Sequence, residues 1–205
     1  MSSQEPTGAL EVLNEAGQGV RVEFHKSADR YGHVILAIHS EKRYPVLTSF
    51  EGNLGQVLPH IPCFLEFHQQ GQTLFLTGAS SAGHWSMSLQ IAEAPFPEEG
   101  EHGCHAATQF LSFDIACRLK ESGHLVGSEY LLAENFDSHP DGVDTTALVA
   151  DLAGDAPGLQ LLGANPFSSS VSHADGANLR LFSPDKLPEK LPATVQWRYA
   201  VSVTR

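Results

Sequence analysis

The sequence predicts an all-β fold, an antiparallel β-sandwich or sandwich-like barrel, with one short helix. Three observations support this. The longest regular segments alternate apolar and polar residues, the pattern of strands with one buried face. No segment of similar length shows the helical period. Short turn sequences such as QQGQ and KESGH separate the strand-like segments. Many strands with almost no helix are typical of sandwiches and barrels.

Three segments show the alternation most clearly: 84–91, 109–119 and 193–203. In each segment the apolar residues occupy every second position and therefore share one face. The residues expected to point inward are Trp85, Met87, Leu89 and Ile91; Leu111, Phe113, Ile115, Cys117 and Leu119; and Ala193, Val195, Trp197, Tyr199, Val201 and Val203.

Six weaker strands are expected at 20–25, 33–39, 63–68, 73–78, 128–134 and 179–182. A short helix is expected after residue 143, in DTTALVADLAG, because Asp144 is a suitable N-cap and Gly154 follows the expected end. We find no internal repeat and no linker. Residues 1–205 are therefore expected to form a single β-rich domain.

Charge and composition narrow the partners and the compartment. Twelve Lys and Arg residues stand against 24 Asp and Glu residues, a formal net charge of −12. This balance argues against nucleic acid, which is bound through cations on phosphates, and against an anionic membrane surface. The three cysteines form no CxxC motif, and we find no basic leader or long apolar run. We expect a cytoplasmic protein.

Two segments, 93–107 and 135–144, are too long for simple hairpin connections, and long loops are often functional. Sequential strands are often neighbours in a sheet. If strands 84–91, 109–119 and 125–134 formed a meander, both loops would leave the same end of that sheet. Their side chains would then converge on one site.

The first of these loops contains EEGEHGCH (98–105), and it supplies most of a candidate metal site. Imidazole, thiolate and carboxylate together suit Zn²⁺, and three protein ligands with an open position suit a catalytic ion. Glu101 is the candidate general base. The alternative to a metal site is a solvated acidic loop with no ligand. The candidate metal ligands are His102, Cys104, His105, His139 and Asp141.

Other catalytic and metal-binding patterns are incomplete. GASSAG (78–83) resembles the nucleophile elbow G-x-S-x-G, but Ala82 replaces the last glycine and a strand follows instead of a helix. FDSHPDGVD begins like a calcium loop, but Leu148 occupies the twelfth position, where a bidentate Glu is needed. We find no P-loop and no GxGxxG motif.

Two segments, GHWSMS (83–88) and FDIACRLKESGHLVGSEYLL (113–132), resemble part of a family of conserved bacterial proteins of unknown function, of planctomycete type. The resemblance implies no activity and assigns no catalytic residue. GHW also matches the G-x-W pattern of lipocalin-like barrels, although in that family the motif belongs to the first strand. An antiparallel barrel of about eight strands can enclose one small ligand.

We therefore expect a non-enzymatic binding or interaction domain for a small molecule or a protein, because every catalytic pattern lacks a required part. The alternative is a metal-dependent hydrolase with a His/Asp site between loops 93–107 and 135–144. If the outward faces of the strands are not exposed to solvent, a second sheet, a loop or another subunit would cover them. A homo-oligomer is therefore one expected arrangement. Side chains expected on outer faces are Arg21, Glu23, His25, His33 and His39 of the first hairpin, and Asp114, Arg118, Gln196 and Arg198.

Overall fold

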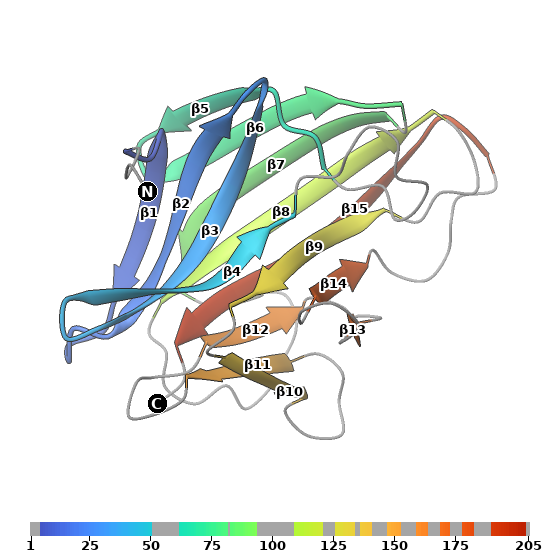
Figure 1. Ribbon diagram of the computed structural model, residues 1–205. Coiled ribbons are helices and arrows are strands. Elements are labelled where there is room, and N and C mark those ends of the chain that lie inside the picture. Colours follow the sequence, from blue (N-terminus) through green and yellow to red (C-terminus); the bar gives the residue numbers. More distant parts are fainter. Residues whose placement is uncertain are drawn as a thin grey trace.

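The computed structural model describes residues 5–50, 62–81, 83–93, 109–120, 126–133, 136–140, 147–152, 159–163, 169–172, 178–182 and 190–203. Within these ranges every regular element is a strand, and all paired strands are antiparallel. The strands form two sheets that pack as a sandwich, with the blue strands of the first sheet in front of the green strands of the second (Figure 1). The predicted all-β sandwich is confirmed.

The seven-stranded sheet begins with a meander of four consecutive strands. The turn between its third and fourth strands has positive φ at both Ser40 (50°) and Glu41 (66°), the geometry of a two-residue hairpin turn. That turn contains no glycine, so the sequence gives little sign of it. The strand order is β1 (Gly8–Leu13), β2 (Gly19–Ser27), β3 (Arg30–His39), β4 (Lys42–Ser49), β9 (Gly127–Leu132), β14 (Asn178–Phe182) and β13 (Ser169–Ser172).

The eight-stranded sheet is built around the three strands with the clearest sequence pattern. The C-terminal strand inserts beside β8, where Trp197 lies opposite Ile115 and Tyr199 opposite Phe113. The strand order is β10 (Phe136–Pro140), β11 (Ala147–Leu152), β12 (Leu159–Gly163), β15 (Ala193–Val203), β8 (Phe110–Leu119), β7 (Gly83–Ala92), β6 (Thr73–Ala79) and β5 (Glu66–Gln70).

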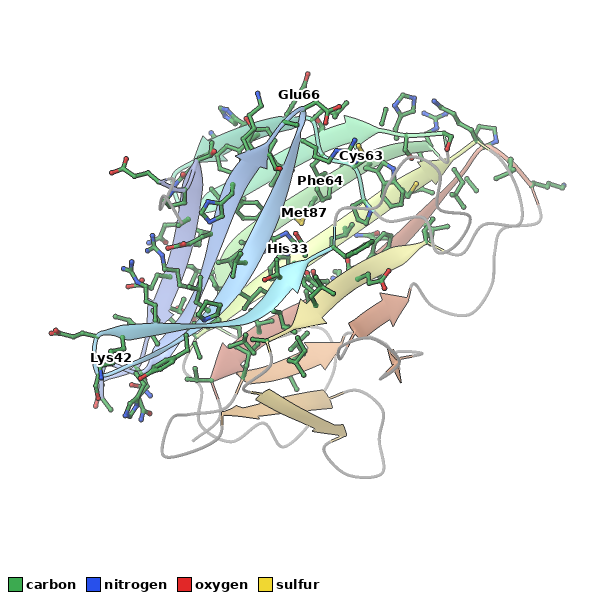
Figure 2. All side chains as sticks on the ribbon, in the orientation of Figure 1. His33, Lys42, Cys63, Phe64, Glu66 and Met87 are labelled. Atoms are coloured by element: carbon green, nitrogen blue, oxygen red, sulfur yellow. The ribbon has the colours of Figure 1, made fainter. Side chains whose placement is uncertain are left out.

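The core lies between the inward faces of the two sheets. Trp85, Phe113 and Tyr199 are among its largest fully buried side chains, and each fully buried side chain of this kind contributes about 1.5–3 kcal/mol to folding. Side chains fill the space between the sheets, whereas Lys42 and Glu66 lie at the periphery (Figure 2). The period-two pattern therefore predicted the buried face of the central strands correctly.

A contact between β3 and the segment before β5 joins the two sheets. Tyr31 forms an isolated antiparallel bridge with Phe64, and the Tyr31 amide donates to the Phe64 carbonyl at 2.8 Å. Phe67 packs near Tyr31 and Phe24, with ring centroids 5.6 and 5.7 Å apart. This seam holds the start of β3 against the eight-stranded sheet.

Two sequence predictions about this architecture are wrong. The expected helix after residue 143 is a strand over Ala147–Leu152, paired on both sides with β10 and β12. ALVADL mixes strong helix formers (Ala147, Leu148, Ala150, Leu152) with weak ones (Val149, Asp151), and sheet pairing overrides such weak local preferences. The expected meander also fails, because β8 pairs with β7 and β15, whereas β9 lies in the other sheet.

The outer face of the eight-stranded sheet is exposed where the sequence placed charged and amide side chains. Arg118, Gln196 and Arg198 are exposed and Asp114 is half-buried. The Gln196 side-chain amide donates to the Asp114 carboxylate at 2.7 Å. In the isolated chain, water therefore reaches this part of the face.

No helix in the described ranges is long and apolar enough to cross a membrane.

Candidate functional site

Most of the residues of the predicted metal site lie outside the described residues. These are Glu101, His102, Cys104, His105 and Asp141. His139 belongs to β10, opposite Val149 of β11. Three strands separate β10 from β8, which is a distance of roughly 19 Å at the usual strand spacing. The three-strand meander from which the site was predicted is therefore not formed.

The described ranges contain no group of three or more His, Cys, Asp and Glu side chains placed to hold a metal ion. The Zn²⁺ site and the general-base role of Glu101 therefore stay predictions. The site that the structure does describe lies elsewhere, between the two sheets.

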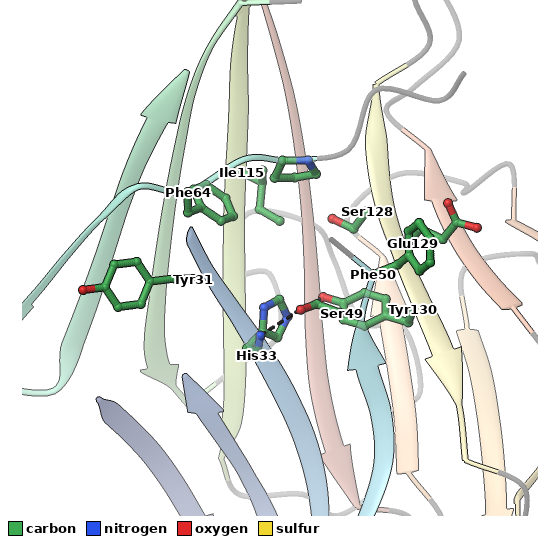
Figure 3. A pocket seen from close by; sticks show the side chains of 10 residues that line it. Tyr31, His33, Ser49, Phe50, Phe64, Ile115, Ser128, Glu129 and Tyr130 are labelled. Atoms are coloured by element: carbon green, nitrogen blue, oxygen red, sulfur yellow. Dashed lines mark hydrogen bonds between the residues drawn. The ribbon is translucent and has the colours of Figure 1, made fainter. Parts of the chain in front are cut away.

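A small pocket opens between the two sheets beside β3 (Figure 3). About 20 Å³ of it is open to the centre of a water molecule, which is room for about one or two waters. Its walls come from segments that are far apart in the sequence. The lining residues are Tyr31, His33, Ser49, Phe50, Pro62, Phe64, Ile115, Ser128, Glu129 and Tyr130.

His33 supplies the ring at the floor of this pocket, and its position is fixed by backbone and ring contacts. Its amide donates to the Ser49 hydroxyl at 2.7 Å, just where β3 and β4 stop pairing. Its ring lies 5.2 Å from that of Phe24 and 5.5 Å from that of Phe113. Only 7 % of His33 is exposed, so the imidazole belongs to the core.

A chain of hydrogen bonds runs from His33 into the core. The Nε2 atom of His33 lies 2.9 Å from the Tyr130 hydroxyl, which in turn hydrogen-bonds to the Tyr199 hydroxyl. We call His33, Tyr130 and Tyr199 the buried chain. Beside it, the Trp197 indole donates to the Ser128 hydroxyl at 3.1 Å.

Sheet pairing places the members of the buried chain. Ser49 lies opposite Tyr130 in the β4–β9 pair, so the two side chains share the inward face. Tyr199 stacks on Phe113 of the adjacent strand, with ring centroids 4.6 Å apart. The Tyr130 and Tyr199 rings meet edge to face, at 84°. The chain thus crosses from the seven-stranded to the eight-stranded sheet.

Burial moves the titrating groups of the buried chain away from neutrality. It lowers the pKa of His33 to about 3, because the charged imidazolium loses its hydration. It raises the pKa of Tyr130 and of Tyr199 well above the usual value for tyrosine. All three side chains are therefore neutral at pH 7.

Among the described residues, the pocket lining contains no Lys and no Arg. Its acidic member, Glu129, is 5 % exposed, and its carboxylate is turned away from the His33 ring (Figure 3). The groups that face the pocket are therefore aromatic rings, aliphatic carbon, hydroxyls and a neutral imidazole. Such a lining can hold an uncharged group and orient it by hydrogen bonding.

The prediction that His33 faces outward is wrong. Its segment, HVILAIH, is apolar at both parities, so alternation cannot tell the inner face from the outer one. The structure places Ile35 and Ala37 on the inner face with His33, and a bulge lies between Ile35 and Leu36. The pairing of β2 with β3 indicates the correct face, because His33 lies opposite Phe24, which is buried.

Comparisons of the chain with protein-family models, with curated proteins and with solved structures find no match.

Proposed function

We propose that this protein is a non-enzymatic binding module that takes the end group of a small neutral molecule into the pocket at His33. The observation that carries the proposal is the character of the lining. It is mainly aromatic and aliphatic, with a few polar groups held in place by other side chains. Ligand sites commonly combine an apolar wall with a small number of fixed polar groups.

The size of the pocket supports the binding of an end group rather than a whole molecule. Enclosed sites for whole small molecules usually have volumes of about 300–1,000 Å³, and the space open to water centres here is about 20 Å³. A net charge of −12 also disfavours anionic ligands.

The protonation states support binding rather than acid–base catalysis. A general acid or base works best when its pKa lies near the working pH. The pKa of His33 lies far below neutrality, and the pKa values of Tyr130 and Tyr199 lie far above it. These groups are suited to giving and accepting hydrogen bonds without transferring a proton.

The test is a screen of small neutral fragments against the full chain, followed by NMR through the side-chain signals of His33 and Tyr130. We expect some fragments to shift both sets of signals. Phe64→Trp should fill the pocket and abolish these shifts, because Phe64 is buried in its wall.

The matched control is Phe75→Trp, the same exchange at an exposed position of β6, which should leave binding intact. The proposal fails if no fragment perturbs His33 and Tyr130, or if Phe64→Trp binds the same fragments as the wild type.

A further inference from the structure

The outer face of the eight-stranded sheet carries two arginines that have no charged partner. Arg118 of β8 and Arg198 of β15 are exposed, and within the described residues neither forms an ion pair or a side-chain hydrogen bond. On the outer face of the other sheet, Arg21 and Arg43 each lie within 4.0 Å of two carboxylates. Because the chain has 24 acidic and only 12 basic residues, a guanidinium without a carboxylate needs an explanation.

A carboxylate lies on the same face of the same strand. Asp114 and Arg118 are four residues apart in β8, so both point outward, with Ala116 midway between them. Asp114 is half-buried, and Gln196 donates to its Oδ1 atom at 2.7 Å. Even Arg198, which lies opposite Asp114 in the described register, forms no ion pair with it. The Oδ2 atom of Asp114 can therefore accept from a donor outside the chain.

The positions of these two charges on β8 are related by symmetry. A two-fold axis in the plane of the sheet that crosses β8 at Ala116 would exchange them. In a symmetric dimer each contact occurs twice, once in each direction, so Asp114 of either copy would lie over Arg118 of the other. Sheets stack face to face about 10 Å apart, a gap that a guanidinium and a carboxylate reaching from opposite sides can bridge.

We propose that a second copy of this chain docks on the outer face of β6, β7, β8 and β15, through two reciprocal ion pairs between Asp114 and Arg118. A different partner could use either charge alone, but it would not require the two charges to lie at equal distances from one point. This face is opposite to the one that borders the pocket, so the inference goes beyond the proposed binding function and does not depend on it.

The side chains around the axis suit two sheets that approach each other. Ser86 of β7 lies opposite Ala116, and Ser88 lies opposite Asp114, so small side chains surround the charged ones. The outward positions of these four strands carry one carboxylate and two guanidiniums, Asp114, Arg118 and Arg198, in a chain of net charge −12. Two copies that meet here avoid contact between acidic surfaces, which would repel each other.

The size of this face indicates a dimer that dissociates on dilution. The four strands offer roughly 600 Å² per copy at the usual strand spacing and rise. Two copies would together bury roughly 1,200 Å², the lower end of the range for stable interfaces.

Charge reversal tests the reciprocal pairs, with sedimentation equilibrium of the full chain at several concentrations as the measurement. We expect a reversible monomer–dimer equilibrium for the wild type. Asp114→Arg and Arg118→Asp each bring like charges together at both contacts, so each should weaken the dimer at least about tenfold. A wild-type chain that stays monomeric up to its highest soluble concentration would overturn the proposal. So would a monomeric chain that binds heparin through Arg118, because its partner would then be a polyanion.

The two single variants should dimerise with each other, although neither does so alone. Mixing them places the two arginines of Asp114→Arg over the two aspartates of Arg118→Asp, so both contacts are restored. Recovery in the mixture also shows that both variants are folded. If the mixture stays monomeric, or if either single variant dimerises as tightly as the wild type, the reciprocal pairing is wrong.

The matched control is Lys42→Asp, which changes the net charge as Arg118→Asp does but at an exposed position of the other sheet. It should leave the dimer unchanged. Equal weakening by the two variants would overturn the proposal, because net charge rather than this face would then control association. Binding of fragments at His33 should be the same in Arg118→Asp as in the wild type, so a failure of the dimer leaves the proposed function standing.

Discussion

The two faces of the seven-stranded sheet stabilise their polar side chains differently: the outer face by ion pairs and the inner face by hydrogen bonds between neutral groups. On the outer face, Arg21 lies 2.6 Å from Glu23 and 3.1 Å from Glu11, and Arg43 lies within 4.0 Å of both carboxylates. On the inner face, the hydrogen-bond partners that the described residues give the His33 ring are neutral, through the buried chain. Water helps to stabilise the charges on the outer face, whereas the inner groups are stabilised by hydrogen bonds to one another.

This difference predicts where substitutions matter. The ion pairs of the outer face are half-buried, with the Arg21 and Glu23 side chains 19 % and 16 % exposed, and the water that still reaches them keeps the worth of each pair at about 1 kcal/mol. A buried hydrogen-bonding group left without a partner loses the full free energy of its hydration. The inner face should therefore respond strongly to the loss of one hydroxyl, and the outer face weakly to the loss of one charge.

The largest effect should follow from Tyr130→Phe. This exchange removes the central hydroxyl and leaves both His33 Nε2 and the Tyr199 hydroxyl short of a partner. We predict a loss of about 3 kcal/mol in the free energy of unfolding, measured with urea. Tyr44→Phe, in the same sheet but outside the buried chain, should change it by less than about 1 kcal/mol. Equal effects of the two variants would remove the distinction between the faces.

The next effect is a loss of stability in acid. The pKa of His33 is about 3 in the folded chain and about 6.5 when unfolded. Between these values the unfolded state binds more protons, so stability falls as the pH falls. His33 alone should lower the free energy of unfolding by about 2 kcal/mol between pH 7 and pH 5.

Unfolding at several pH values checks this, with His33→Phe as the comparison. The variant is less stable at pH 7, because Tyr130 loses its hydrogen-bond partner His33, but its loss of stability between pH 7 and pH 5 should be smaller by the contribution of His33. If the two stability curves fall in parallel, the imidazole is not neutral in the folded chain.

The smallest effect concerns the outer face. Glu23→Gln removes a carboxylate that accepts from Arg21 and lies 3.6 Å from His25. We predict a loss of no more than about 1 kcal/mol, which shrinks as salt is added. Urea unfolding at low and high salt measures both quantities. A loss of several kcal/mol that is independent of salt would mean that the outer face is as tightly coupled as the inner one.

The sequence allowed the fold class to be predicted because β7, β8 and β15 each bury one face and leave the other wet. It did not reveal β11, where a segment with mixed local preferences is held in a strand by β10 and β12. It also hid the turn at Ser40 and Glu41, which reaches positive φ without glycine. Local preference is weak in these places, and contacts from distant segments decide.

The pocket could not be predicted for a related reason. It combines His33, Phe64, Ile115 and Tyr130, and no spacing in the sequence brings these residues together. Their meeting depends on the pairing of β4 with β9 and on the packing of one sheet against the other. The motif that drew attention in the sequence, EEGEHGCH, lies outside the described residues.

The most direct single test is an NMR titration of the His33 imidazole in the folded wild-type chain, from about pH 8 down to about pH 5, the range in which an ordinary histidine gains its proton. We predict that His33 stays neutral throughout this range while the chain remains folded, as a fixed hydrogen-bonding group requires. A midpoint near pH 6.5 would contradict this. The imidazole would then exchange protons near neutrality, and the case for a neutral, non-catalytic binding pocket would fail.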